Sequence, residues 1–438
     1  MKIAIIGLGY VGLPLAIEFG KKYNVIGFDI NKNRVEELQK GEDHTGEADT
    51  TELREVLNSD FKSLNLLNET SENAVNGSLT FTAEEQDIKD CDIYIVTVPT
   101  PIDKHNVPDL QPLIKASEMI GRVISGGNVV IYESTTYPGC TEEDCVPVIE
   151  KTSGLKFNKD FFVGYSPERI NPGDKEKKLT NIVKVVSGST PIIADFVENL
   201  YSSIITAGTY KASSIKVAEA SKIVENVQRD VNISFVNELA LIFDRMGIDT
   251  NEVIDAASTK WNFVKYTPGL VGGHCISVDP YYLASKAEKL GYLPKVILSG
   301  REVNNSIAPF IAHKVLKLMM QKNNTLENAN ILILGVTFKE NCPDIRNTKV
   351  VDIYKELIAF GVNVDVCDPF VCEEEIKQEY NIDIIKQIDK NKKYAAVILA
   401  VAHQEFLYNF DFESFHKSGT IIFDVKGKVD RRWVDGRL

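Results

Sequence analysis

The 438-residue sequence has no CxxC pair, and its six histidines show no HxxxH or HExxH spacing. Clustered zinc and histidine-ligated metal sites are built on such spacings, so we predict no metal. The seven cysteines are an odd set without the pattern of a disulfide framework, and a reducing cytoplasm suits them best. They are Cys91, Cys140, Cys145, Cys275, Cys342, Cys367 and Cys372.

No apolar run approaches the length that a membrane-spanning helix needs. The apolar start carries Glu18 and regularly placed glycines and has no basic region beyond Lys2, so we expect neither a signal peptide nor an anchor. A net charge of -13 argues against general binding to nucleic acid or to an anionic membrane, although a local basic pocket for phosphate remains open. Hydrophobic content of 44% and charged content of 25% are typical of a globular protein.

The chain is too long for one compact core, and its patterns divide it into three segments. Residues 2–29 are a strand, a glycine turn, a helix and a second strand, and apolar runs recur at 93–98, 129–132, 161–165 and 182–186. Residues 213–246 lack Gly and Pro and repeat apolar residues at helical spacing, and helical patterns continue at 250–257 and 280–304. A second set of apolar runs follows at 330–334, 362–367, 395–401 and 420–425.

These patterns predict an α/β protein with two Rossmann-like doubly wound domains, joined by a long central helix and a helical segment. We expect a first domain at residues 1–205, a helical domain at 206–308 and a second α/β domain at 309–438. The Asn-rich stretch 321–330 is the expected linker edge.

Gly7, Gly9 and Gly12 form a GxGxxG motif between a strand and a helix, and Asp29 ends the next strand. Glycines there let the backbone approach a pyrophosphate, and the helix N-terminus favours its charge. A carboxylate at Asp29 would bond the adenine ribose and repel a 2′-phosphate, which favours NAD over NADP. The alternative is a tight turn that binds nothing.

Cys275 lies in the turn Gly272-Gly273-His274-Cys275, four residues before Asp279. A thiol beside a nicotinamide can add to an aldehyde, and loss of a second hydride then gives a thioester that water cleaves, so an alcohol becomes an acid. A helix starting near Pro280 would favour the thiolate. The alternatives are that Cys275 is a small buried hydrophobe and that Asp279 caps the helix rather than holding a water.

Lys222 and Asn226 stand four apart on one face of the long helix, opposite a valine stripe. One interpretation is a solvated face with Lys222 paired to Glu219, and the other is a pair of donors that stabilise an oxyanion. Spacing alone does not choose between them.

Other polar residues follow expected strands, where ligands of doubly wound folds bind. Glu168 and Thr135 do so in the first segment, and basic residues that could meet phosphates do so in the last. On spacing alone, a position on the solvent-exposed surface is the favoured interpretation of each. The last-segment residues are Phe338 with Lys339, Arg346 and Lys426.

Taken together, these blocks resemble the UDP-glucose/GDP-mannose dehydrogenase family over nearly the whole chain. The matching blocks are Gly7-Leu8-Gly9-Tyr10-Val11-Gly12, Val98-Pro99-Thr100-Pro101, Glu133-Ser134-Thr135, Ser166-Pro167-Glu168, Lys222 with Asn226, and 272–279.

The resemblance implies an NAD domain, a helical segment that forms a homodimer or higher oligomer, and a UDP-binding domain. It also implies a four-electron oxidation with two NAD. Cys275 would be the nucleophile, Lys222 and Asn226 would hold the C6 oxyanion, Thr135 and Asp279 would position water, and Glu168 would assist thioester hydrolysis.

The resemblance also implies the binding residues. The cofactor site would comprise Gly7, Gly9, Tyr10, Val11, Gly12, Asp29, Arg34, Thr100, Ser134 and Arg346. The sugar nucleotide would meet Glu168, Lys222, Asn226, Gly272, Phe338, Lys339 and Lys426.

Residues 259–263, 268–275 and 338–348 resemble the family branch that acts on UDP-N-acetylhexosamines, and His274 stands where the glucose branch usually has serine. The expected substrate is UDP-N-acetylglucosamine, with the galacto epimer close behind, oxidised for surface polysaccharide synthesis. Residues 169–173 depart from the glucose pattern, which leaves the sugar contacts open. The alternatives are a UDP-glucose dehydrogenase and a non-catalytic NAD-binding redox sensor that uses Cys275 as a switch.

Overall fold

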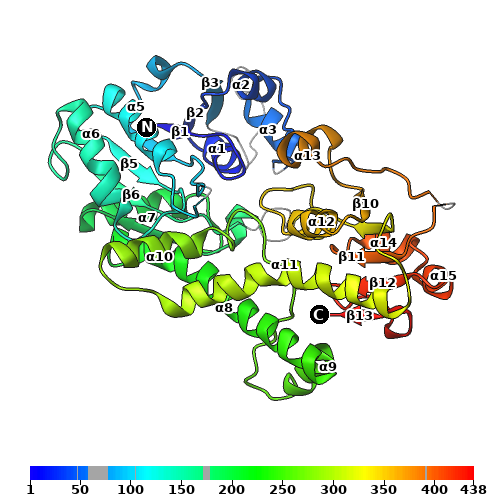
Figure 1. Cartoon of the computed structure of the whole chain (residues 1–438). Helices are drawn as coiled ribbons and strands as arrows, with labels where there is room; N and C mark the ends of the chain where they lie inside the picture. Colours follow the sequence, from blue (N-terminus) through cyan, green and yellow to red (C-terminus); the bar gives the residue numbers. More distant parts are fainter. Residues whose placement is uncertain (47, 58–76, 104, 171–177, 390–391) are drawn as a thin grey trace. The chain divides into compact units, whose positions relative to one another are not determined.

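The computed structural model describes residues 1–46, 48–57, 77–103, 105–170, 178–389 and 392–438 (Figure 1). They form two compact units, residues 1–225 with 281–286 and residues 226–280 with 287–438. Each unit contains one sheet, which confirms the predicted α/β class with two doubly wound sheets. None of the described helices is both long and apolar enough to span a bilayer.

The sheet of the first unit has the strand order β3-β2-β1-β4-β5-β6-β7-β8. All neighbouring pairs are parallel except β6 and β7. The chain therefore reverses its winding between β1 and β4, where polar groups following both strands open onto one edge. The strands are β1 (Lys2–Ile6), β2 (Asn24–Phe28), β3 (Ser78–Thr82), β4 (Ile93–Val96), β5 (Val129–Tyr132), β6 (Phe162–Tyr165), β7 (Lys184–Gly188) and β8 (Thr209–Lys211).

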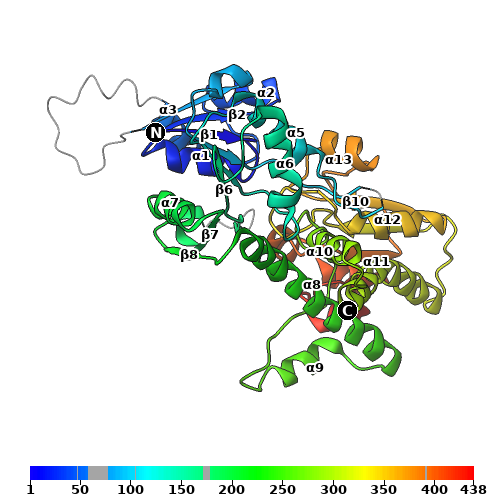
Figure 2. The ribbon, with the colours of Figure 1, turned by 90° about the vertical axis from the view of Figure 1, so that its left-hand side faces the viewer.

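Helices cover both faces of this sheet, and its inner strands are buried from end to end, as parallel strands between helices are. Helices α5 and α6 pack against each other, and α7 packs on β7 and β8 (Figure 2). The helices are α1 (Gly12–Gly20), α2 (Lys32–Gln39), α3 (Thr50–Leu57), α5 (Gln111–Val123), α6 (Val146–Ser153) and α7 (Pro191–Ser202), with short turns η1 (Glu85–Ile88), η2 (Thr141–Cys145) and η3 (Leu179–Asn181).

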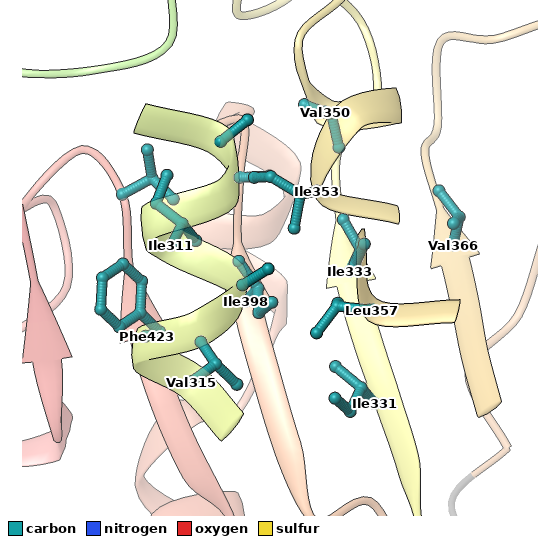
Figure 3. Packing of buried hydrophobic residues seen from close by; sticks show 14 of the residues in the cluster. Ile311, Val315, Ile331, Ile333, Val350, Ile353, Leu357, Val366, Ile398 and Phe423 are labelled. Atoms are coloured by element: carbon teal, nitrogen blue, oxygen red, sulfur yellow. The ribbon is translucent and has the colours of Figure 1, made fainter. Parts of the chain in front are cut away.

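The sheet of the second unit is parallel throughout, in the order β10-β9-β11-β12-β13. Helices α11 and α12 pack Ile311, Val315 and Ile353 onto Ile333 and Ile398 of its central strands (Figure 3). The elements are α9 (Thr250–Ala257), α10 (Asp279–Lys289), α11 (Lys295–Gln321), β9 (Asn330–Leu334), α12 (Val350–Ala359), β10 (Asn363–Cys367), α13 (Glu373–Tyr380), β11 (Ala396–Leu399), α14 (Gln404–Asn409), α15 (Phe412–Lys417), β12 (Ile421–Asp424), η4 (Arg431–Trp433) and β13 (Gly436–Arg437).

The helical pattern expected at 280–304 is two helices. The chain breaks after α10 at Gly291, where φ is +81°, and α11 then runs to Gln321. Its extension follows from Ile311 and Val315, which are fully buried in the second unit. The expected boundary at 308/309 thus falls inside a helix, and the division into three domains stays a prediction.

The long helix α8 (Ile215–Met246) forms where the sequence predicts it, but its polar face is not solvated. Lys222 and Asn226 are only 7% and 5% exposed, whereas Val217 and Val224 are 46% and 55% exposed. The interpretation of a solvated face with Lys222 paired to Glu219 is therefore wrong. Helical spacing marks which residues share a face, but the neighbouring elements decide which face is buried.

Glu219 anchors the start of α8. Its buried carboxylate accepts hydrogen bonds from the backbone N–H groups of Gly139 and Thr141, the latter at 2.9 Å. Burial raises the pKa of this carboxyl to about 7, against the lowering effect of Thr141 and Gly139. The folded state therefore binds the Glu219 proton more tightly than the unfolded chain does.

This proton linkage predicts a pH dependence that the Glu219→Gln substitution removes. The stabilisation from the bound proton is present below about pH 4.5 and is lost as the pH rises to about 7. Relative to the variant, the wild type should lose on the order of 1 to 3 kcal/mol of unfolding free energy over that range, as measured by urea denaturation. The exposed Glu118→Gln on α5 is the matched control. Parallel pH profiles for the wild type and Glu219→Gln would contradict this linkage.

Candidate active site

The glycine turn after β1 is shaped for close approach to a ligand. Gly7 has φ +95°, and a Cβ on Gly12 would lie 1.8 Å from the Gly7 carbonyl oxygen, so no side chain fits there. A Cβ on Gly9 would meet nothing within 4 Å. The N-terminus of α1 opens beside this space. An open glycine turn at a helix N-terminus suits the pyrophosphate of a dinucleotide.

Asp29 and Arg34 hold the glycine turn in place through hydrogen bonds. The Asp29 carboxylate accepts the Leu8 N–H at 2.8 Å and the Asn31 N–H at 2.9 Å. The buried Arg34 donates from Nε to the Leu8 carbonyl at 3.1 Å and pairs with Asp43 at 2.7 Å. Both therefore shape the turn, and their contact with an adenosine ribose stays a prediction.

The remaining residues predicted for the cofactor site in this unit lie at the same sheet edge. Thr100 follows β4 and is half-buried, as are Tyr10 and Val11 of the turn. The Ser134 hydroxyl, after β5, donates to the Val98 carbonyl at 2.6 Å and so ties the two strand ends together. The half-buried Thr135 comes next.

Glu168 follows β6 and belongs to a buried ionic cluster that the sequence did not reveal. Lys184 Nζ lies 3.1 Å from Glu168 Oε2 and 2.7 Å from Glu133 Oε2, and the Tyr201 hydroxyl donates to Glu133. The signal in the sequence was a lysine inside the apolar run 182–186 and a glutamate directly after the run 129–132.

The thiol turn lies in the second unit. Cys275 is half-buried, and its carbonyl accepts the N–H groups of Val278 at 3.0 Å and Asp279 at 2.8 Å. This winds the chain directly into α10, which begins at Asp279. The amide of Asn226 donates to the buried Asp279 carboxylate, so the carboxylate and the helix face meet four residues beyond the thiol.

The glycines of this turn are packed against the loop after β9. A Cβ on Gly272 would lie 2.6 Å from the Asn347 carbonyl oxygen, and one on Gly273, where φ is +85°, would lie 2.9 Å from the Phe338 ring. The His274 and Phe338 rings meet edge to face. The second unit therefore brings the thiol turn together with residues 338–347.

The basic residues near this loop are partly committed to carboxylates. Arg346 folds back on Asp344, with 3.0 Å from Nε to each carboxylate oxygen, and Lys426 lies 3.4 Å from Glu340. Lys339 is half-buried. A role for Arg346 in the cofactor site, whose other residues lie in the first unit, stays a prediction.

Each unit brings together predicted site residues whose chemistry is complementary. The first unit gathers a dinucleotide turn, a serine and a threonine and an anchored carboxylate at one sheet edge. The second gathers a thiol, a buried carboxylate and half-buried basic side chains. Among the residues that the structure describes, no three His, Cys, Asp or Glu side chains form a metal-binding group.

Comparison with known proteins assigns the chain to a family. The NAD binding domain of the UDP-glucose/GDP-mannose dehydrogenase family matches residues 1–205, its central domain 216–306 and its UDP binding domain 332–431.

The similar proteins span the whole chain. UDP-N-acetyl-D-glucosamine 6-dehydrogenases from Pseudomonas aeruginosa and Salmonella typhi are 54% and 51% identical, and each match covers 100% of this chain and 99% of the relative. The solved structure of UDP-D-ManNAc dehydrogenase from Pyrococcus horikoshii is 30% identical with a TM-score of 0.86, over 100% of this chain and 98% of that one. The expected family and its NAD cofactor are confirmed, and the chain belongs to the UDP-glucose/GDP-mannose dehydrogenase family as an NAD-dependent nucleotide-sugar dehydrogenase.

Proposed function

We propose that this enzyme oxidises the C6 hydroxyl of a UDP-N-acetylhexosamine to the uronic acid through a thioester on Cys275. The observation that carries the proposal is the packing of the Cys275 turn against the Phe338 loop, with the Asn226–Asp279 pair at its end. A dehydrogenase that stopped at the aldehyde would need no thiol there.

The cofactor is held by the turn at Gly7, Gly9 and Gly12, with Asp29 and Arg34 fixing its shape. Bound NAD supplies the hydride acceptor for both oxidations. The residues fit it because the turn leaves space beside Gly9 and presents a helix N-terminus to a diphosphate.

The thiol makes the second oxidation possible by bonding to the aldehyde carbon that the first oxidation produces. The sulfur of Cys275 bonds to the C6 carbonyl carbon, and the thiol proton ends on the new hydroxyl group. Loss of a hydride from C6 and of the hydroxyl proton to water then makes C6 a thioester. Water then adds to C6, the carbon–sulfur bond breaks, and the carboxylic acid and the free thiol remain.

The other groups act on the charges that these steps create. The Lys222 ammonium and the Asn226 amide stabilise the C6 oxyanion, and Thr135 and Asp279 hold the water. Glu168 assists the attack of that water on the thioester. The burial of Lys222 and Asn226 supports this assignment, because a buried donor gains more from an oxyanion than a solvated one.

The choice of sugar rests on relatives. The two that are 54% and 51% identical are named for UDP-N-acetyl-D-glucosamine, whereas one named for UDP-N-acetyl-D-mannosamine is 32% identical. We therefore place UDP-N-acetylglucosamine first and its galacto epimer second. Phe338, Lys339, Lys426 and Gly272 are the proposed contacts of the nucleotide sugar. A nucleotide-linked uronic acid is a donor for polysaccharide synthesis, in keeping with a role in supplying surface polysaccharides.

We also propose a homodimer through α8. Phe235, Ile242 and Met246 are 56%, 43% and 61% exposed, and their spacing puts them on one helix face. Large apolar side chains repeated along one exposed helix face are a common protein interface. Sedimentation of the wild type and of Phe235→Lys tests the assignment.

The open space at Gly9 predicts a specific cofactor defect. Gly9→Ala should fold normally, because the added methyl group meets no protein atom within 4 Å. It should weaken NAD binding by about tenfold or more, roughly 1.4 kcal/mol, since the methyl group occupies the space left for the diphosphate. Calorimetric titration with NAD measures the loss. Gly126→Ala, another open position, should bind NAD normally, and normal NAD affinity of Gly9→Ala would refute the assignment of the turn.

The thioester predicts that Cys275→Ser makes no acid. The hydroxyl is a far weaker nucleophile than a thiolate, so we expect uronate formation to fall by about 10³-fold or more while NAD binding is retained. Detection of the uronate by mass spectrometry is the measurement. The exposed Cys372→Ser should keep full activity and is the control. Full uronate production by Cys275→Ser would sink the mechanism.

A panel of UDP-sugars tests the substrate. With UDP-N-acetylglucosamine we expect two NADH per sugar and the highest kcat/KM, ahead of UDP-N-acetylgalactosamine. Preference for UDP-glucose by more than about tenfold, roughly 1.4 kcal/mol of transition-state binding, would decide for a glucose dehydrogenase. Binding of NAD without turnover on any sugar would indicate the redox sensor instead.

A further inference from the structure

The ionic cluster of the first unit has a lysine at its centre. Lys184 is 2% exposed and bonds to both Glu133 and Glu168, which are also buried. The Tyr201 hydroxyl donates to Oε1 of Glu133, the oxygen that does not face Lys184. One cation thus connects the residue that follows β5 with the one that lies beyond β6.

The fold explains why Lys184 meets Glu168. Strand β7 is antiparallel to β6, with Tyr165 paired to Ser187 and Gly164 to Gly188. Extending this register beyond the end of β6 brings residue 168 opposite residue 184. Strand β7, which with β8 runs opposite to β1–β6, therefore carries its first residue to the edge where the parallel strands end.

Burial raises the pKa of the Glu133 carboxyl, whereas the Lys184 ammonium keeps its charge. Burial lowers the pKa of Lys184, but the attraction of Glu133 and Glu168 outweighs it, and the net pKa is raised. A buried ionic group of this kind is weak evidence for stability, because apolar side chains often fill such a space as well or better. Its use is to fix one geometry.

The Glu168 carboxylate is held at both oxygens. Oε1 accepts the backbone N–H groups of Arg169 and Ile170, and Oε2 accepts from Lys184 at 3.1 Å. The two backbone bonds place the carboxylate at the start of the loop, and the lysine sets the rotation that remains. Loss of Lys184 would leave Oε2 without its charged donor.

We propose that Lys184 is a positioning residue for thioester hydrolysis, which fixes the Glu168 carboxylate in the orientation that assists the attacking water. This inference rests on the proposed function, because it deepens the role given there to Glu168. Lys184 touches neither the sugar nor the cofactor in this role and acts through Glu168 alone.

The test separates hydrolysis from the two oxidations. The double substitution Lys184→Met with Glu133→Gln removes one buried cation and one buried anion together, so the cluster keeps its net charge. In rapid-mixing experiments with UDP-N-acetylglucosamine and NAD, we expect a burst of about two NADH per site and then a slow steady state. Intact-protein mass spectrometry should detect the sugar nucleotide joined to Cys275. The steady-state kcat should fall about 10- to 100-fold and KM should fall with it, so that kcat/KM changes little, because only the step after thioester formation is slowed.

Two further variants calibrate the result. Lys21→Met is the matched control, because Lys21 also bridges two glutamates of the first unit, Glu18 at 2.7 Å and Glu52 at 2.6 Å, on α1 and α3. It should show no covalent intermediate. Lys184→Arg keeps the charge with a different reach, and its thioester should decay faster than that of the double variant.

Glu168→Gln distinguishes the possible failures. If it accumulates the thioester and the double variant hydrolyses its thioester at the wild-type rate, Lys184 has no positioning role. A uniform slowing of all steps without a covalent intermediate would make Lys184 merely structural and would also overturn the inference. If Glu168→Gln itself accumulates no thioester, the proposed role of Glu168 fails, and the role of Lys184 fails with it.

Discussion

Both sheets depend on the same constraint at the ends of two neighbouring parallel strands. A glycine that follows one strand bonds to the end of the other, and an aspartate that follows the other strand holds the glycine turn. In the first unit, the Gly7 N–H donates to the carbonyl of Phe28 at 2.9 Å, and the next residue, Asp29, accepts the N–H that follows Gly7. In the second unit, the Gly335 N–H donates to the carbonyl of Cys367 at 2.8 Å, and Asp368 accepts the N–H groups of the next two residues. The positive φ of both glycines turns the chain away from the strand, and the carboxylate holds it there. A turn fixed in this way can stay open on its outer side without collapsing.

In the second unit, a buried histidine adds further hydrogen bonds to this arrangement. His403, after β11, is fully buried, and its Nε2 lies 3.0 Å from Asp368 and 3.2 Å from the Thr337 hydroxyl. Its Nδ1 accepts the Asn341 N–H at 2.9 Å. The loop that carries Phe338 and Lys339 is therefore tied at both ends to the strands beneath it. Phe338 in turn limits the space beside Gly273. The hydrogen bonds at the strand ends therefore help to fix the geometry of the thiol turn.

Sequence reasoning succeeded where a signal is local and failed where it depends on partners far along the chain. The GxGxxG turn, Asp29 and the run of α8 were predicted because a few consecutive residues decide them. The burial of Lys222 was left open, because periodicity gives a shared face without saying what packs on it. The ionic cluster was missed because its bonded members are 16 to 68 residues apart, and Lys184 meets Glu168 only because strand β7 is reversed. The contacts of the Arg34 guanidinium with Leu8 and Asp43 were also not foreseen, because spacing does not reveal them, and its role at the cofactor stays a prediction.

The distribution of buried cations bears on how an acidic chain handles anionic ligands. Lys184, Arg34 and Arg301 are each buried and each paired with carboxylates of the protein. Lys222 is also buried, but among the residues that the structure describes no hydrogen bond or ion pair reaches its ammonium group. An ammonium that no carboxylate of the protein neutralises can attract a negative charge that arrives beside it. That charge need not be present on the bound substrate; an oxyanion that exists only while C6 is tetrahedral would be attracted at the step that needs it. The paired cations thus hold elements of the fold together, whereas Lys222 suits the role proposed for it, the stabilisation of the C6 oxyanion.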